Sequence, residues 1–259
     1  MLSAKNISYR IGKKQILNDI NVDFRPGEFT MIVGPNGSGK STFLKIFSGE
    51  LNKYEGTVWY DDKKVNSLKK EELAKSRSVM SQQQELNFPL TVEEVVMMGR
   101  YPHFTFNPSK KDETICNDAI ERMNLALFRE RNYLTLSGGE KQRVQFARVL
   151  AQIWEKPEQG HRYLFLDEPL NSLDISYQQE ILKLSTEFSK ADTILIAILH
   201  DINLALAYAS RILFMKEGKI LYETNNANEV TGPVIKDIFD VNATVIHPGN
   251  GLPPVVIYQ

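Results

Sequence analysis

A glycine-rich segment near the start of the chain has the residue types and spacing of a phosphate-binding loop. Residues 34–42 read Gly-Pro-Asn-Gly-Ser-Gly-Lys-Ser-Thr and fit the pattern G-x-x-x-x-G-K-[ST]. Its glycines let backbone N–H groups line a concavity at a helix N-terminus, where the helix dipole favours anions. Lys40 would neutralise the terminal phosphates of a nucleotide, and Ser41 would supply an oxygen to Mg²⁺. The predicted nucleotide-binding residues here are Gly34, Pro35, Asn36, Gly37, Ser38, Gly39, Lys40, Ser41 and Thr42.

The segments on either side of this loop fit the same interpretation. Residues 28–33 predict a buried strand, and residues 40–49 predict a helix with Phe43, Ile46 and Phe47 on one face. A glycine-rich turn without a ligand would not need this strand–loop–helix frame. The pattern leaves the class of protein open, because kinases, GTPases, motors and transport ATPases all use it.

Two adjacent carboxylates end another apolar segment, Tyr163-Leu-Phe-Leu-Asp-Glu. Ligands of open α/β sheets bind at the carboxyl ends of strands, and adjacent strand residues face opposite ways. We therefore expect different tasks for the two acids. Asp167 would hold Mg²⁺ through water, and Glu168 would polarise the attacking water as general base. The alternative, a pair of solvated acids, is disfavoured by the phosphate loop upstream.

His200 and Gln82 also follow strand-like segments. His200 would donate a hydrogen bond to the γ-phosphate or hold the attacking water. The remaining histidines are interpreted as structural or exposed: His103, His161 and His247. Gln82 would reach Mg²⁺ and the water, although the glutamines that follow it make this signal weaker.

Composition excludes several classes of protein. The 259 residues carry 31 Lys and Arg against 32 Asp and Glu, a net charge of −1, which disfavours a nucleic-acid binder that works by phosphate neutralisation. The longest apolar run, residues 194–199, is far shorter than a bilayer crossing requires. We expect no secretion signal, because no basic start and apolar block open the chain. The single cysteine, Cys116, forms no internal disulfide and agrees with a reducing cytoplasm.

The order of the expected elements indicates an α/β protein with a helical insertion. Strand-like segments fill the first 33 residues, and strand, helix, strand and helix alternate from 163 to 209, which implies right-handed crossovers and a parallel sheet. Residues 82–131 are polar and helical, and Thr91-Val-Glu-Glu94 is a capping pattern that opens one helix there. The tail after Gly218 predicts a short hairpin, one or two small helices and a last strand.

A second anion site is predicted at Leu136-Ser-Gly-Gly-Glu140. Ser137 as N-cap, two glycines, and Glu140 reaching back would build another helix terminus with N–H groups for a phosphate. Alone, a capping box means little. Together with the loop and the strand-end acids, this stretch resembles the signature of the ATP-binding cassette family, the ATPase subunits of ABC transporters. The resemblance covers essentially the whole chain.

The resemblance implies a role for each motif. Residues 34–42 correspond to Walker A, Asp167 and Glu168 to Walker B and the catalytic glutamate, and residues 171–174 to the D-loop. Tyr9 would stack on adenine, Gln82 is the glutamine of the hinge loop, and His200 is the switch histidine. The implied magnesium ligands are Ser41, Gln82 and Asp167. The implied nucleotide-binding set also includes Tyr9, Ser137, Gly138, Gly139, Glu140 and Asp174.

Such proteins work as head-to-tail dimers, so Ser137, Gly138 and Gly139 of one copy would touch the γ-phosphate held by Lys40 of the other. The D-loop departs from the family pattern, since it reads Leu-Asn-Ser where many members have Thr-Ser-Ala. Asn171 keeps hydrogen-bonding capacity, so the departure concerns fine geometry rather than activity.

The fold class implied is an α/β P-loop NTPase of the ABC ATPase type. It has a core with a mixed or parallel sheet, an N-terminal antiparallel β subdomain and an inserted α-helical subdomain. We place the catalytic core at 1–81 and 160–223, the helical and signature lobe at 82–159, and a C-terminal extension at 224–259, all in one ABC ATPase domain.

Further segments narrow the resemblance to importers. Residues 79–82, 87–96 and 99–103 look like those of iron-chelate, heme and cobalamin importers, and residues 147–154 and 247–254 are most similar to the heme (hemin) import ATPases. This implies ATP and Mg²⁺ as cofactors, a homodimer of ATPase subunits, transmembrane permease subunits and, indirectly, a substrate-binding protein. The chain would lie peripherally on the cytoplasmic face of the cell membrane. Nucleic-acid binding and direct heme binding are not expected, and His103 and His247 are not interpreted as heme ligands.

Several alternatives stay open or are disfavoured. In the nearest alternative, the chain has the same role in an importer of an iron-siderophore or of cobalamin. A non-transport ABC ATPase of DNA repair or translation would carry coiled-coil insertions, zinc cysteines or a second cassette. A small-molecule kinase would not need residues 136–140. An exporter subunit remains within the family, although residues 88–91 and the lack of a fused membrane domain favour import.

Overall fold

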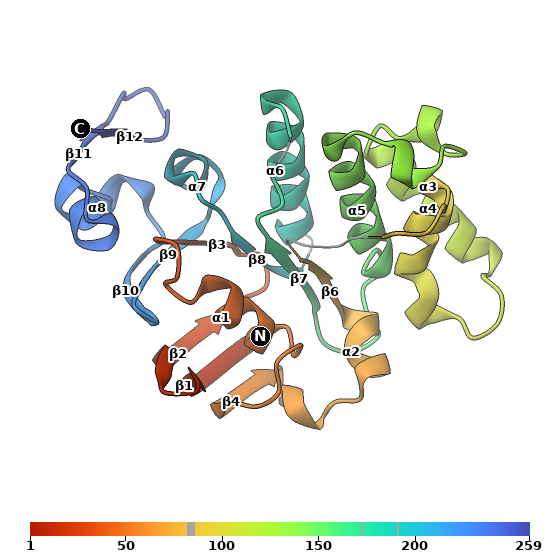
Figure 1. The fold of residues 1–259 in the computed structure, drawn as a ribbon, viewed down its shortest axis with the longest axis horizontal. Coiled ribbons are helices and arrows are strands. Elements are labelled where there is room, and N and C mark those ends of the chain that lie inside the picture. Colours follow the sequence, from red (N-terminus) through yellow and green to blue (C-terminus); the bar gives the residue numbers. More distant parts are fainter. Residues whose placement is uncertain (82–85, 172, 191) are drawn as a thin grey trace. The chain divides into compact units, whose positions relative to one another are not determined.

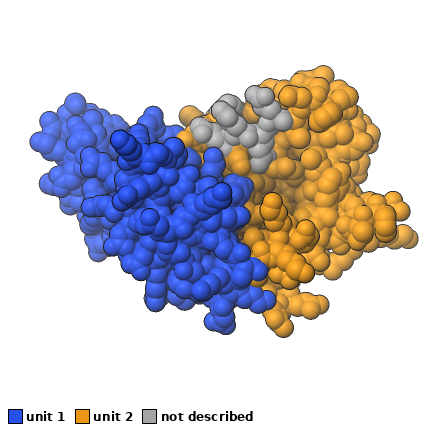
Figure 2. Space-filling model, turned by 60° about the horizontal axis from the view of Figure 1, so that its bottom comes forward, with its two compact units in different colours: residues 1–67, 182–259 blue, residues 68–181 orange. Residues whose placement is uncertain are grey.

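The chain folds into two compact units. The computed structural model describes residues 1–81, 86–171, 173–190 and 192–259. Unit 1 comprises residues 1–67 and 182–259, and unit 2 comprises residues 68–181 (Figure 2). The predicted boundaries at 81/82, 159/160 and 223/224 remain predictions.

Unit 1 opens with an antiparallel sheet in the order β2-β1-β4-β5 (Figure 1). Its strands are β1 (Leu2–Ile11), β2 (Lys14–Phe24), β4 (Glu55–Tyr60) and β5 (Lys63–Lys64). Buried positions alternate with more exposed ones at Leu2 and Ala4 of β1 and from Ile20 to Phe24 of β2, because side chains on a strand point to opposite faces of the sheet. The N-terminal antiparallel subdomain predicted from the sequence is confirmed.

The second sheet of unit 1 is mixed. β3 (Phe29–Val33) pairs in parallel with both β8 (Thr193–Ile198) and β9 (Arg211–Lys216), and β10 (Lys219–Thr224) pairs antiparallel with β9. Every residue of β3 and β8 is buried, which explains their continuous apolar sequences.

Helix α1 (Lys40–Phe47) is anchored by three aromatic rings. Phe43 and Phe47 are stacked with ring centroids 3.9 Å apart, and Phe24 of β2 meets them edge-on at 6.3 and 5.8 Å. Burial of rings of this size and the preferred edge-to-face geometry fix the helix behind the glycine-rich loop.

Unit 2 is mainly helical. Its β6 (Arg77–Met80) and β7 (Arg162–Asp167) are parallel. Its helices are α2 (Lys70–Ser76), α3 (Val92–Met97), η2 (Met98–His103), α4 (Lys110–Arg122) and α5 (Gly138–Gln152). Short 3₁₀ turns are η3 (Ala126–Phe128) and η4 (Tyr133–Thr135), with η1 (Val65–Ser67) in unit 1. Both predicted capping patterns are confirmed, because Thr91 caps α3 and Ser137 caps α5, each with its glutamate bonded back.

The chain then returns to unit 1 through α6 (Ile175–Lys190), and α7 (Ile202–Tyr208) follows β8. The tail contains η5 (Ala227–Glu229), α8 (Gly232–Phe239), β11 (Ala243–Ile246) and β12 (Val255–Tyr258). The last two strands form a separate antiparallel hairpin, of which the sequence predicted only β12. Asn203 of α7 binds both polar backbone groups of Val256, at 3.3 and 2.7 Å, and so attaches this hairpin to α7.

In the part of the chain that the structure describes, no helix combines the length and the apolar character that a membrane crossing requires.

A buried ion network holds the helices of unit 2. Arg100 of η2 is 1% exposed, and its guanidinium donates to Asp112 Oδ1 at 2.9 Å, Ala151 O at 2.8 Å and Glu155 Oε2 at 3.0 Å. Burial disfavours the charge of Asp112, but hydrogen bonds from Ser109 and Arg100 outweigh it and lower the pKa of this carboxyl. The network therefore joins η2, α4 and the end of α5.

Replacing Asp112 by alanine leaves the Arg100 charge buried with an incomplete set of partners. We expect Asp112→Ala to lower the free energy of unfolding by about 3 kcal/mol. Glu155→Ala is the control, with an expected loss under about 1 kcal/mol, since the Glu155 side chain is 33% exposed. Because the pKa of Asp112 is lowered on folding, the advantage of the wild type should persist at neutral pH and disappear as the pH falls through that lowered pKa. Urea titrations at several pH values measure it, and equal losses in both variants would contradict the assignment.

Candidate functional site: a nucleotide-binding loop and a capped helix

The glycine-rich loop links the buried strand β3 to helix α1, the frame that the sequence predicted. The N-cap of α1 is Gly39, in the left-handed region at φ +101°, with no side-chain hydrogen bond to the helix end and no acidic residue in the first turn. A helix begun in this way directs its first N–H groups and the positive end of its dipole toward the loop. Asn36 and Gly37 are exposed at the tip of the loop, while Gly34 is buried at its base.

The polar side chains of the loop fit a bound anion. Lys40 is 6% exposed, and its Nζ donates to the carbonyls of Gly34 at 2.8 Å and Pro35 at 3.0 Å, so its charge lies within the loop. The Ser38 hydroxyl is buried and has no hydrogen-bond partner among the described residues. Buried polar groups are normally hydrogen-bonded, so this hydroxyl is suited to a phosphate oxygen.

Tyr9 and His200 lie near the same loop within unit 1. Tyr9 is half-buried beside register shifts of β1 and is paired with Leu17 of β2. A Cβ on Gly39 would lie 2.8 Å from the Leu17 side chain, so β2 connects Tyr9 to the loop. His200 is exposed just after β8, where Leu199 N–H donates to Ile32 O at 3.2 Å at the end of β3. Both residues therefore lie toward the loop end of the strands, while their contacts with a nucleotide remain predictions.

Asp167 and Glu168 have different environments, although not because adjacent strand residues face opposite ways. Asp167 is the last residue of β7 and is 5% exposed, whereas Glu168 has left the strand in a left-handed conformation, φ +52°. Its Oε2 accepts a hydrogen bond of 2.7 Å from the Asn171 amide. A left-handed glutamate costs conformational energy, and such strain is often found at functional residues. The turn, rather than strand alternation, separates the two carboxylates.

The second predicted anion site is the start of α5. Ser137 N–H donates to Glu140 Oε2 at 2.7 Å, and Glu140 N–H donates to the Ser137 hydroxyl at 3.3 Å. The Ser137 backbone N–H, and then its hydroxyl, lower the pKa of the Glu140 carboxyl, which keeps it charged. Ser137 and Gly138 are exposed and Gly139 is half-exposed. The terminus is thus ordered and accessible.

Within unit 2 this helix contacts the segment after β7. Gln142 Nε2 donates to Pro169 O at 2.8 Å, and the Arg143 guanidinium lies 4.1 Å from the centroid of the Tyr177 ring. Sequence reasoning assigned Gln142 no role. Its position two residues after Glu140 in the same motif was the available signal.

The remaining predicted residues have the following places. Asp174 lies at the start of α6, where Oδ1 accepts hydrogen bonds from Tyr177 N–H at 3.1 Å and Ser176 Oγ at 2.8 Å, which lower the pKa of its carboxyl. Ser41 and Thr42 are half-buried in the first turn of α1. Gln82 lies outside the described residues.

A magnesium ion fits the predicted ligands by their chemistry. Ser41, Gln82 and Asp167 offer only hydroxyl, amide and carboxylate oxygens, which this ion prefers. No group of three or more His, Cys, Asp or Glu side chains suited to a metal occurs among the described residues.

Comparison with known proteins identifies the family. The model of the family described as "ABC transporter" matches residues 17–171, from the second strand through both predicted anion sites to the D-loop. The chain belongs to the ABC transporter family. It is an ATPase of this family.

Curated relatives match along the whole chain. The hemin import ATP-binding protein HmuV of Gloeobacter violaceus is 41% identical over 257 residues, 99% of this chain and 94% of the relative. The hemin import ATP-binding protein HmuV of Mesorhizobium japonicum is 40% identical over 258 residues, which are 99% of this chain and 98% of the relative.

Solved structures of the family have the same fold. A dimeric ATP-binding cassette in a post-hydrolysis state with ADP and phosphate superposes with a TM-score of 0.74 at 29% identity, covering 86% of this chain and 98% of that one. An inward-facing, metal-chelate type ABC transporter superposes with a TM-score of 0.80 at 22% identity, covering 100% of this chain and 96% of that one. The predicted P-loop fold class is confirmed.

The loop geometry predicts the effect of removing its lysine. Lys40→Ala should raise the Kd for ATP by about 100-fold, because a buried charge that would bond the terminal phosphates is lost. Lys45→Ala, in the last turn of the same helix and exposed, is the matched control and should bind as the wild type does. Titration with a fluorescent ATP analogue measures both, and unchanged affinity in Lys40→Ala would contradict the loop's assignment.

Proposed function

We propose that this protein is the ATP-hydrolysing subunit of a membrane importer that takes up heme. The observation that carries the proposal is the 41% identity over 99% of the chain to a hemin import ATP-binding protein. Identity that extends through both the loop and the helical lobe favours a shared task as well as a shared fold.

In the proposed reaction, loop N–H groups and Lys40 hold the triphosphate. Mg²⁺, when bound by Ser41, Gln82 and Asp167, supplies positive charge that offsets the charge developing on the phosphate oxygens. The Glu168 carboxylate accepts a proton from the attacking water, and His200 donates a hydrogen bond to the γ-phosphate. Tyr9 stacks on the adenine and places the nucleotide over the loop.

A second copy of the chain completes each site. The accessible N-terminus of α5 has Ser137, Gly138 and Gly139 available for a phosphate held by its partner. The dimeric cassette with ADP and phosphate, similar in fold, supports this arrangement. Each nucleotide would then join two copies, so that ATP closes the dimer and hydrolysis releases it.

The subunit would lie peripherally on the cytoplasmic face of the cell membrane. Residues 82–131 would pass closure of the dimer to transmembrane permease subunits, and a substrate-binding protein would deliver the cargo. Heme would not touch this subunit. The His103 Nε2 already lies 2.7 Å from Gln152 O in the half-buried end of the helical lobe, and desolvation lowers the pKa of His103.

The general base can be tested separately from binding. Glu168→Gln should retain ATP affinity, lower kcat by about 100-fold or more and accumulate an ATP-bound dimer, since proton transfer is lost while both anion sites remain. Glu113→Gln, on the exposed surface of α4, is the control and should turn over normally. Phosphate release and size-exclusion chromatography with ATP measure the two effects. A variant that stays monomeric and fully active would contradict the assignment.

The cargo is tested with the complete importer. The ATPase subunit, its permease and its binding protein are reconstituted in liposomes, and ATP hydrolysis is measured with heme, an iron-siderophore or cobalamin added to the binding protein. We expect stimulation of several-fold by heme and none by the other two. Stimulation by a siderophore or cobalamin instead would reassign the cargo while leaving the ATPase role in place.

A further inference from the structure

Three backbone segments of unit 1 meet at the end of the glycine-rich loop where helix α1 begins. They are residues 16–18 of β2, residues 38–39 of the loop, and the two-residue turn Glu217–Gly218 that joins β9 to β10. Gly218 N–H donates to Ser38 O at 3.0 Å, and Asn18 N–H donates to Gly218 O at 2.9 Å. Gly218 thus bonds the loop on one side and the edge of β2 on the other.

The turn has little freedom to move away from the loop. Lys216 and Lys219 are paired, and the two residues between them both have positive φ, +51° for Glu217 and +74° for Gly218. This is the pattern of a type I′ hairpin, whose twist matches that of the strands. A short hairpin of this type holds its second residue in one place.

Close backbone contacts leave no room for a side chain at this junction. A Cβ on Gly218 would lie 2.4 Å from Ile16 O, and one on Gly39 would lie 2.8 Å from the same oxygen. A Cβ on Gly34, at the base of the loop, would lie 2.0 Å from Met215 O of β9. The β9–β10 hairpin therefore contacts the loop at both of its ends.

We propose that Gly218 is a positioning residue for phosphate binding: its N–H fixes the Ser38 carbonyl, and so orients the N–H groups of the loop that bind the triphosphate. An N–H donor that contributes to anion binding must be aimed before the ligand arrives, since otherwise the cost of ordering the loop reduces affinity. The junction supplies that order through backbone groups alone.

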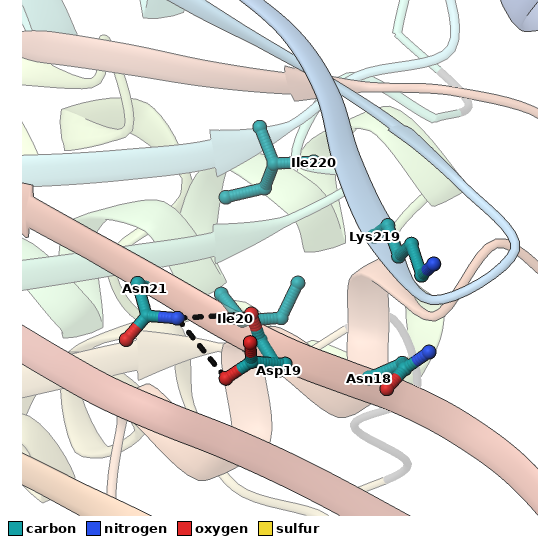
Figure 3. A pocket seen from close by; sticks show the side chains of 6 residues that line it. All are labelled: Asn18, Asp19, Ile20, Asn21, Lys219 and Ile220. Atoms are coloured by element: carbon teal, nitrogen blue, oxygen red, sulfur yellow. Dashed lines mark hydrogen bonds between the residues drawn. The ribbon is translucent and has the colours of Figure 1, made fainter.

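Side chains next to this junction provide a control for the role proposed for its backbone. Asn18, Asp19, Ile20, Asn21, Lys219 and Ile220 line a hollow of about 420 Å³. Among these residues the Asn21 amide donates to Asp19 at 3.1 Å, and the Lys219 side chain also lines the hollow (Figure 3). Lys219 follows Gly218 in the chain, yet no hydrogen bond of the junction comes from its side chain, so it offers a control next to the proposed residue.

The test is Gly218→Ala, compared with two controls. Gly251→Ala imposes the same backbone strain, because Gly251 has φ +75° but nothing within 4 Å of its Cβ position. Lys219→Ala removes the neighbouring side chain. We expect the Kd for ATP to rise about tenfold in Gly218→Ala, and KM to rise with little change in kcat at saturating ATP, because the loop is displaced while the catalytic groups remain. Both controls should stay within about twofold of the wild type.

An unchanged Kd in a folded Gly218→Ala would overturn the proposal. If that variant does not fold, amide hydrogen exchange of the wild type decides: ATP should slow exchange at Gly218 together with the loop, and unaltered exchange at Gly218 would overturn it. The inference rests on the proposed ATP binding by the loop. A wild type that binds no ATP would refute that function itself, whereas a wild type and variant that bind ATP equally would refute only the role of Gly218.

Discussion

The predicted binding of a phosphate chain by backbone N–H groups is the interaction that the buried strand, loop and helix of unit 1 would serve. Such groups bind an anion only if they converge and are not already bonded to the protein. In unit 1 the predicted phosphate loop runs between a fully buried strand, β3, and a helix, α1, whose N-cap Gly39 makes no side-chain hydrogen bond to the helix end. The stacked rings of Phe43 and Phe47 then hold the helix against β2 through Phe24. Packing behind the helix thus fixes its N-terminus at the end of the glycine-rich loop.

The two helix termini that the sequence predicted as anion sites differ in how they are capped. α1 has no acidic residue in its first turn and no side-chain cap, so its positive end would serve the proposed nucleotide, and Lys40 adds a positive charge inside the loop. α5 is capped by Ser137 and Glu140, whose reciprocal hydrogen bonds order a terminus that is otherwise exposed. In the proposed dimer, a capped terminus would keep its shape before a nucleotide held by the second copy meets it. The cap also holds the negative charge of Glu140 at this terminus. That charge would make the α5 terminus alone a weaker anion site than the α1 terminus.

The helical unit is fixed by polar groups as much as by apolar packing. Residues 99–103, which carried part of the resemblance to importers, have structural tasks. A Cβ on Gly99 would lie 2.2 Å from Arg148 O, so η2 lies against α5, and Arg100 and His103 bond to α5 carbonyls at Ala151 and Gln152. The side chain of Gln152 in turn bonds Ala74 O, Arg77 O and the Ser78 hydroxyl, joining α5 to β6. Movement of this unit would therefore carry η2, α5 and β6 together.

The sequence by itself determined the motifs, the strand and helix that flank the predicted phosphate loop, and both capping boxes, because each depends on neighbours within a few residues. It also determined the α/β fold class, because that class follows from the order of strands and helices along the chain. It could not place contacts between distant segments. The left-handed Glu168, the bond from Gln142 to Pro169, the strand β11 and the meeting of Gly218 with Ser38 were decided by tertiary structure. These contacts join positions far apart in the chain or fix a backbone conformation that no residue pattern demands, and backbone groups carry no sequence signal of their partners.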